Sequence, residues 1–230
     1  MPTDDKVLAY TVSHGDRRFL RETVPALRGS AGMWFDWAVW LGRPSIDAAG
    51  DATALLHKPD RTGIQYLQQW PDNKGQHYAT REALALAKAE GYKWLLRLDD
   101  DIMPKTKRWL KRMIYTLEEL RKTVKDEHYR IVAAPKIIGL RNPLQACGEV
   151  SKGQHSTVEL MSILGGACRL HPMELMEGYE PPAYGPVGRL DPESIADHVH
   201  NHDGFLVRLP NIRVVHRTNV LEAKDSEEMQ

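Results

Sequence analysis

Three consecutive aspartates, Asp99, Asp100 and Asp101, carry the clearest chemical signal in this sequence. They follow residues 94–98 (Trp-Leu-Leu-Arg-Leu), an apolar run typical of a buried strand. Carboxylates at the carboxyl end of a strand in an open α/β sheet lie where such sheets bind ligands. An Asp-x-Asp pair offers hard oxygen donors that can hold Mg²⁺ or Mn²⁺ against a diphosphate. The alternative is an acidic helix start. One aspartate would serve that purpose, so three favour a metal site.

The residues around the triplet alternate between strand-like and helix-like segments. Strands are expected at residues 7–12, 35–41, 54–57, 94–98, 130–138, 158–164, 205–209 and 212–215. Helices are expected at residues 17–28, 76–90, 105–125, 171–177 and 192–202. Residues 43–53 are rich in turn formers, and residues 63–70 fit neither pattern. The alternation in the first half predicts an α/β fold with a mostly parallel sheet and helices on both faces.

The composition is that of a globular chain of 230 residues, 42% hydrophobic and 27% charged, which is enough to bury one core. The 31 basic and 31 acidic residues cancel, so no overall field draws the chain to nucleic acid or membrane, although a local patch can exist. Two cysteines are too few for a disulfide scaffold. The N-terminus is polar, and no apolar stretch reaches the ~18 residues that cross a bilayer. We expect a cytoplasmic protein.

Several short motifs occur along the chain in a fixed order. They are Asn73-x-Gly75-x-x-x-Ala79-x-Arg81 at the head of a helix, the acidic triplet, Gly165-Gly166, Glu193 with Gly204 eleven residues later (204 − 193), and His216. This order resembles the GT-A glycosyltransferases, above all the family 2 nucleotide-sugar enzymes, and the resemblance covers most of residues 7–217. The chain departs from the family at Glu82, where an Asn is usual, and at residues 11–14, where the family has Pro-x-Tyr-Asn.

The resemblance implies a GT-A-like, Rossmann-like sheet with a smaller acceptor-side subregion. It implies one catalytic domain over residues 1–220, with a nucleotide-binding half at 7–101, an acceptor-side half at 102–220 and a frayed tail at 221–230. The implied activity is metal-dependent transfer of a hexose from a nucleoside diphosphate sugar, UDP being the first choice, to an acceptor hydroxyl. The implied cofactor is Mn²⁺ or Mg²⁺.

The family pattern also implies roles for individual residues. Asp101, Asp99 and His216 would hold the metal ion. The nucleotide sugar would contact Thr11, Ser13, Asn73, Gly75, Arg81, Asp99, Asp100, Gly165 and Gly166. An inverting transfer needs a base to deprotonate the acceptor hydroxyl, and the candidates are Glu193, then Asp191, then Asp197. Acidic residues also suit a helix start, and without a base on the acceptor side a retaining mechanism stays open.

Two other classes of function stay open. A sugar-nucleotide nucleotidyltransferase shares the sheet but begins with a Gly-rich phosphate loop, and residues 13–18 hold one glycine. For a non-catalytic nucleotide- or sugar-binding module, replacing Glu193 by Gln would leave all measurable behaviour unchanged. The acceptor stays open between a saccharide, a protein, a small molecule and a modified DNA base. A basic run is typical of a solvated helix face and would also suit a nucleic acid or anionic acceptor; it comprises Lys105, Lys107, Arg108, Lys111 and Arg112.

Overall fold

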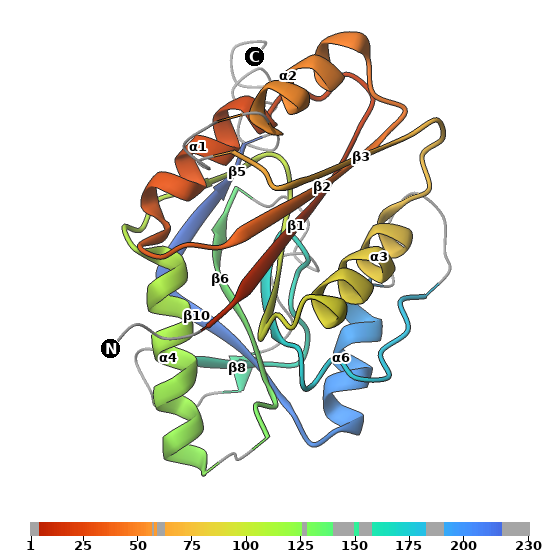
Figure 1. Ribbon diagram of the computed structural model, residues 1–230. Coiled ribbons are helices and arrows are strands. Elements are labelled where there is room, and N and C mark those ends of the chain that lie inside the picture. Colours follow the sequence, from red (N-terminus) through yellow and green to blue (C-terminus); the bar gives the residue numbers. More distant parts are fainter. Residues whose placement is uncertain are drawn as a thin grey trace, which may run out of the picture.

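One sheet organises the described part of the chain (Figure 1). The computed structural model describes residues 5–56, 58, 63–125, 128–139, 150–151, 158–182 and 191–217. Its strands are β1 (Val7–His14), β2 (Asp36–Gly42), β3 (Tyr66–Trp70), β4 (Trp94–Leu98), β5 (Ile102–Pro104), β6 (Ile131–Ile138), β7 (Val150–Ser151), β8 (Glu159–Met161), β9 (Cys168–Pro172) and β10 (Phe205–His216). They lie in the order β3-β2-β1-β4-β9-β6-β10-β8-β7, and β5 pairs with β10 off this path.

The long strands share one direction. β1 is parallel to β2 and β4, β2 is parallel to β3, and β6 is parallel to β10. β9 runs antiparallel to both β4 and β6, so β4 and β6 point the same way. The carboxyl ends of β1, β4 and β10 therefore meet at one edge of the sheet, which is where α/β folds bind ligands. The mixed α/β fold class predicted from the sequence is confirmed.

Helices cover both faces of the sheet. They are α1 (Leu20–Ala31), α2 (Ile46–Leu56), α3 (Gln76–Ala89), α4 (Trp109–Val124) and α6 (Asp191–Asn201). Figure 1 shows α1, α2 and α4 on one side and α3 and α6 on the other. The side chains of β1 point alternately to the two faces of the sheet. Val7 and Ala9 pack on the side of α1 and α4, whereas Leu8 and Tyr10 pack against α3. With both faces covered, β4 is buried at every position.

The strand predicted at residues 54–57 is wrong, because the described part of that segment is the end of α2. Residues 43–53, predicted as turns, supply most of this helix. Ser45 Oγ accepts a hydrogen bond from the Ala48 N–H at 3.2 Å, which satisfies a donor at the helix start. The buried positions Ala48, Ala52 and Leu55 have helical spacing. The alanine and leucine residues of this segment favour a helix more strongly than its glycine and polar residues favour turns.

The helix predicted at residues 171–177 is also wrong, because β9 occupies Cys168–Pro172 between β4 and β6 and residues 173–178 form turns. Two polar residues concealed this buried strand. Arg169 and His171 are 1% and 2% exposed, and Arg169 Nε donates to His171 Nε2 at 3.0 Å. The helix predicted from Lys105 begins later, at Trp109, and is preceded by the short strand β5.

Within the residues described, no helix combines the length and the apolar composition that crossing a membrane requires. The tail predicted at 221–230 lies outside those residues. The division of residues 1–220 into two halves stays a prediction.

Gly204, between α6 and β10, has no room for a side chain. An added Cβ would lie 2.6 Å from the Arg130 carbonyl oxygen and 3.0 Å from that of Val199. We expect Gly204→Ala to lower the free energy of unfolding by about 1–3 kcal/mol, measured in urea, because the backbone must move. Gly50→Ala in α2 is the control, since nothing lies within 4 Å of its added Cβ. It should gain about 0.5–1 kcal/mol from helix propensity. Equal stabilities of the two variants would contradict this account.

Candidate metal centre

Backbone pairing holds the acidic triplet against the end of β10. On one side, the Asp99 N–H donates to the Ala167 carbonyl at 2.8 Å, extending the ladder of β4 and β9. On the other side, β5 and β10 are antiparallel and Ile102 pairs with His216. The Arg217 N–H then donates to the Asp101 carbonyl at 2.9 Å. His216 is 115 residues from Asp101 (216 − 101), and this ladder places it beside the triplet.

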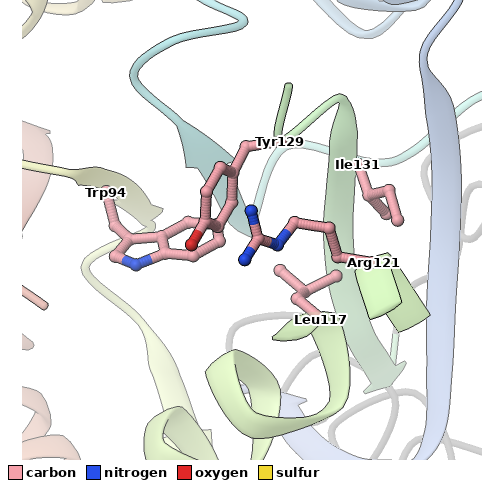
Figure 2. Close-up of a pocket in the computed structure, with 5 residues that line it drawn as sticks. All are labelled: Trp94, Leu117, Arg121, Tyr129 and Ile131. Atoms are coloured by element: carbon pink, nitrogen blue, oxygen red, sulfur yellow. The ribbon is translucent and has the colours of Figure 1, made fainter. Parts of the chain in front are cut away.

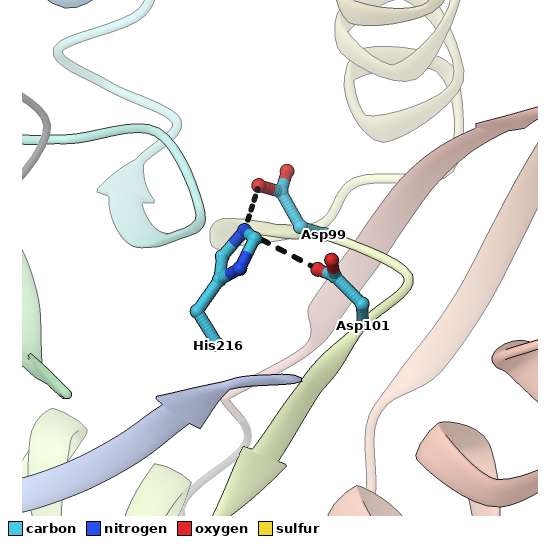
Figure 3. Close-up of side chains that lie close together, drawn as sticks. All are labelled: Asp99, Asp101 and His216. Atoms are coloured by element: carbon cyan, nitrogen blue, oxygen red, sulfur yellow. Dashed lines mark ion pairs between the residues drawn. The ribbon is translucent and has the colours of Figure 1, made fainter. Parts of the chain in front are cut away.

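Asp99, Asp101 and His216 converge on one point (Figure 3). His216 Nε2 lies 3.4 Å from Asp101 Oδ1 and 3.9 Å from Asp99 Oδ2. Each residue offers one ligand atom, and these atoms all lie within 4.8 Å of one another. The Asp101 side chain is fully buried, whereas that of Asp99 is 34% exposed, so the cluster has a buried floor and an open side. Two carboxylates and one imidazole fit a divalent cation such as Mn²⁺ or Mg²⁺.

Asp100 turns away from this cluster into the protein. Its carboxylate accepts a hydrogen bond from the Ser13 hydroxyl, and its carbonyl accepts one from Thr23 Oγ1 at 2.7 Å. The pKa of Asp100 is raised to about 7, chiefly by burial and also by the charges of Asp101 and Asp99, which together outweigh the lowering effect of Arg17 and Ser13. Asp100 therefore anchors the triplet to β1 and α1. Its buried negative charge would destabilise the fold without a nearby cation.

Arg17 is a site residue that the sequence did not reveal. Its Nη2 lies 2.9 Å from Asp100 Oδ1 and 2.7 Å from Asp101 Oδ2, so one guanidinium links two buried carboxylates. Asp101 thereby presents one oxygen to Arg17 and the other to His216. The available signal was its position in the loop after β1, at the ligand-binding edge of the sheet. Only the fold shows that this loop meets β4.

Gly166 contacts Arg97, and Arg97 in turn lies near Asp99 of the triplet. A Cβ added to Gly166 would lie 2.3 Å from Arg97 Nη1, so the glycine backbone lies against the guanidinium. Arg97 is 9% exposed in its side chain, and its Nη2 is 3.7 Å from Asp99 Oδ1. Gly165 is buried and Gly166 is half-buried. The Gly-Gly segment is thus close to Asp99.

The other predicted nucleotide contacts lie apart from the triplet. Thr11 is 1% exposed, and its hydroxyl accepts a hydrogen bond from Trp37 Nε1 at 3.0 Å. Asn73 is exposed beside Gly42 and accepts a bond from the Gly75 N–H at 3.1 Å. Arg81 is exposed on α3. In the described part of the chain, no hydrogen bond or ion pair joins these residues to the triplet. Their roles stay predictions.

The three predicted base candidates lie on α6. Asp191 begins this helix, and Glu193 and Asp197 are exposed on it. Ile195 and Val199 on the same helix are buried against β6 and β10, which fixes the helix to the sheet. Among described residues, no hydrogen bond or ion pair joins Glu193 or Asp197 to the metal-centre cluster. The base assignment stays a prediction.

A small cavity elsewhere is unsuited to a nucleotide (Figure 2). It lies between α4 and the sheet and leaves about 10 Å³ for the centre of a water-sized molecule. The Arg121 guanidinium stacks 3.9 Å from the centre of the Tyr129 ring and fills part of the space. The other lining residues are Trp94, Leu117 and Ile131. This cavity is a packing feature.

Comparison with known proteins supports the fold. No protein-family model matches the sequence, and no curated protein matches it. Among solved structures, GalNAc-T7 with UDP, GalNAc and Mn²⁺ aligns with a TM-score of 0.62 at 14% identity. The alignment covers 93% of this chain and 44% of that one. The chain has a GT-A fold. The mannosyltransferase PcManGT from Pyrobaculum calidifontis, solved with GDP-Man and Mn²⁺, aligns with a TM-score of 0.65 at 12% identity.

The PcManGT alignment covers 93% of this chain and 57% of that enzyme. The chain thus spans about half the length of the glycosyltransferases that it matches. The GT-A fold expected from the motif order is confirmed. Similarity at this level of identity concerns the fold, so the chemistry depends on the site residues described above.

Arg17 provides a test of the electrostatics of the centre. Without metal, Arg17→Met leaves Asp100 and Asp101 without their shared cation. We expect roughly 2 kcal/mol lower stability, less than the full cost of breaking a buried pair because a third of Arg17 is exposed. Mn²⁺ should raise the melting temperature of this variant more than that of the parent.

Arg18→Met is the matched control, because Arg18 pairs with the more exposed Asp47 and Asp51. It should lower the stability clearly less than Arg17→Met does, because an exposed pair is screened by water, and it should leave the Mn²⁺ response unchanged. Thermal unfolding with and without Mn²⁺ measures both effects. If Arg17→Met behaved like Arg18→Met, Arg17 would have no role at the centre.

Proposed function

We propose that this chain is a metal-dependent glycosyltransferase that moves a hexose from a nucleoside diphosphate sugar to an acceptor hydroxyl. The observation that carries the proposal is the Asp99, Asp101 and His216 cluster at the carboxyl end of β4, in a GT-A fold. We treat residues 1–220 as its single catalytic domain.

The cluster suits a cation that meets a diphosphate. A divalent ion held there would neutralise the negative charge of the leaving diphosphate. Asp99 is the partly exposed metal ligand, so its second oxygen can face the ribose of the nucleotide sugar. Asp101 is held by Arg17 and His216, which limits reorganisation during the reaction. Ser13 and Arg17 hold Asp100, which supports the loop from beneath.

We propose Mn²⁺ rather than Mg²⁺ as the resident ion. Mg²⁺ binds through oxygen donors and keeps several waters, whereas an imidazole donor suits transition metals. His216 contributes such a donor. Both glycosyltransferases compared above were solved with Mn²⁺, one with UDP and the other with GDP-Man. We propose a UDP-sugar as the donor, with a GDP-sugar as the second donor to test.

We propose an inverting transfer in which Glu193 is the base. The acceptor oxygen attacks the anomeric carbon, the bond from that carbon to the diphosphate oxygen breaks, and the acceptor proton passes to the carboxylate. Asp191 and Asp197 are the next candidates. The exposed position of Glu193 on a helix fixed to the sheet supports this role, because an acceptor can reach it.

Asp101→Asn tests the metal centre while keeping the size of the side chain. In the parent protein, Mn²⁺ with a UDP-sugar should raise the melting temperature and support slow hydrolysis of the donor. Asp101→Asn and His216→Gln should abolish both effects, because each removes a ligand. Asp47→Asn is the control, since Asp47 is 71% exposed and pairs with Arg18.

A Mn²⁺ response that survived in Asp101→Asn would refute the ligand assignment. Binding of Mn²⁺ and UDP-sugar without any hydrolysis or transfer would identify a non-catalytic binding module. Incorporation of a nucleotide from UTP and a sugar phosphate would identify a nucleotidyltransferase.

Glu193→Gln tests the base. If Glu193 accepts the proton, kcat for transfer should fall about 10²- to 10⁴-fold with KM for the donor unchanged within about threefold. Asp197→Asn, one helical turn away and also exposed, is the matched control and should keep kcat. NMR of the product determines whether the anomeric configuration inverts. Retention of configuration, or loss of kcat only in Asp197→Asn or Asp191→Asn, would refute the assignment.

A further inference from the structure

A group of exposed basic side chains lies next to the metal centre on three elements. Lys105 and Arg213 are joined by a hydrogen bond of 2.9 Å from the Lys105 N–H to the Arg213 carbonyl. Arg213 of β10 pairs with Lys136 of β6 across the sheet. The start of α4 adds the remaining members. We call this group the basic surface; it comprises Lys105, Lys107, Arg108, Lys111, Arg112, Lys136 and Arg213, all exposed.

The basic surface has no compensating carboxylates in the described part of the chain. None of its seven side chains takes part in an ion pair there, and residues 102–117 contain no Asp or Glu. Several exposed or half-buried cations elsewhere are paired, as Arg18 is with Asp51, Lys93 with Asp5 and Arg208 with Glu159, whereas isolated ones such as Lys88 are exposed without a basic neighbour in the adjoining helical turns. The formal charge of the whole chain is +0. The excess of positive charge is therefore local.

Three local features make this arrangement costly for the folded protein alone. The first turn of α4 has no acidic residue, although a helix N-terminus favours anions and disfavours cations. Lys136 and Arg213 place like charges on neighbouring strands, which is also unfavourable. Arg108 adopts a left-handed conformation with φ of 57°, which glycine or asparagine would adopt with less strain. A bound polyanion would offset the two electrostatic costs.

We infer that the basic surface binds the phosphate backbone of nucleic acid. Seven cations match the 6–10 phosphate contacts typical of such binding. Tyr115 is 65% exposed and lies one turn after Lys111 on α4, where its ring can stack on an unpaired base. Arg213 is three residues before His216, about 10 Å along the strand. A bound strand would thus pass close to the metal centre.

An anionic membrane is the less favoured partner. Helices that lie in a membrane interface expose an apolar face between their cationic residues. The apolar face of α4 is instead buried in the core, through Trp109, Leu110, Met113, Ile114 and Leu117. This helix has no apolar face left to insert into lipid.

Fluorescence anisotropy with a labelled 30-nucleotide single strand and a 30-base-pair duplex tests the inference in the full chain, without any sugar donor. The patch variant is Lys105→Gln/Lys107→Gln/Lys111→Gln. The matched control is Lys58→Gln/Lys88→Gln/Lys125→Gln, which removes three exposed lysines away from the basic surface. Because no transfer is measured, the result is independent of the proposed glycosyltransferase activity.

We expect the parent to bind at 50 mM salt, with affinity falling steeply towards 200 mM. The patch variant should bind at least tenfold more weakly, and its slope of log K against log salt for duplex should be smaller by about 2–3. The control should stay within about threefold of the parent, and all three proteins should melt together.

Three results would overturn the inference. They are no binding of the parent at 50 mM salt, equal loss of binding in both variants, and binding only to phosphatidylserine–phosphatidylcholine vesicles. The last would assign the surface to a membrane instead.

Discussion

The antiparallel pairing of β5 with the end of β10 is the constraint on which the site depends. It is only three residue pairs long, yet it joins the acidic triplet to a histidine 115 residues away (216 − 101). Loop closure over such a distance costs conformational entropy that no local interaction offsets. The cost is met by the rest of β10, which pairs with β6 over most of its length. The metal centre is therefore a consequence of the central sheet rather than of the triplet alone.

The triplet divides its three carboxylates between two tasks. Asp99 and Asp101 face the imidazole of His216, whereas Asp100 faces Ser13 and Arg17. Because Asp100 and Asp101 are buried, their mutual repulsion is screened little by water. Arg17 contacts both and offsets that repulsion without occupying the oxygen of Asp101 that faces His216. This division explains why three aspartates occur where a helix start would need one.

The sequence predicted the parts of the fold whose signals are local. β4, α3 and α6 follow from apolar runs and helical spacing, and the motif order led to the GT-A fold. β9 was missed because Arg169 and His171 satisfy each other inside the sheet, and α2 because glycine and polar residues suggested turns. Arg17 was missed because its partners lie 83 and 84 residues away (100 − 17 and 101 − 17). No local pattern shows a contact that only the sheet order creates.

The charges of this neutral chain are segregated along the same short ladder. Asp101 lies at one end of β5 and Lys105 follows its other end, so the chain changes from acidic to basic within four residues, about 13 Å. The acidic end attracts a cation and the basic end attracts phosphate. Because the total charge is zero, these fields cancel at long range and act only near the site, within a Debye length of about 8 Å at physiological salt. A phosphate-bearing partner is thus attracted where it can meet the metal centre, and the protein as a whole has no net charge to bind polyanions elsewhere.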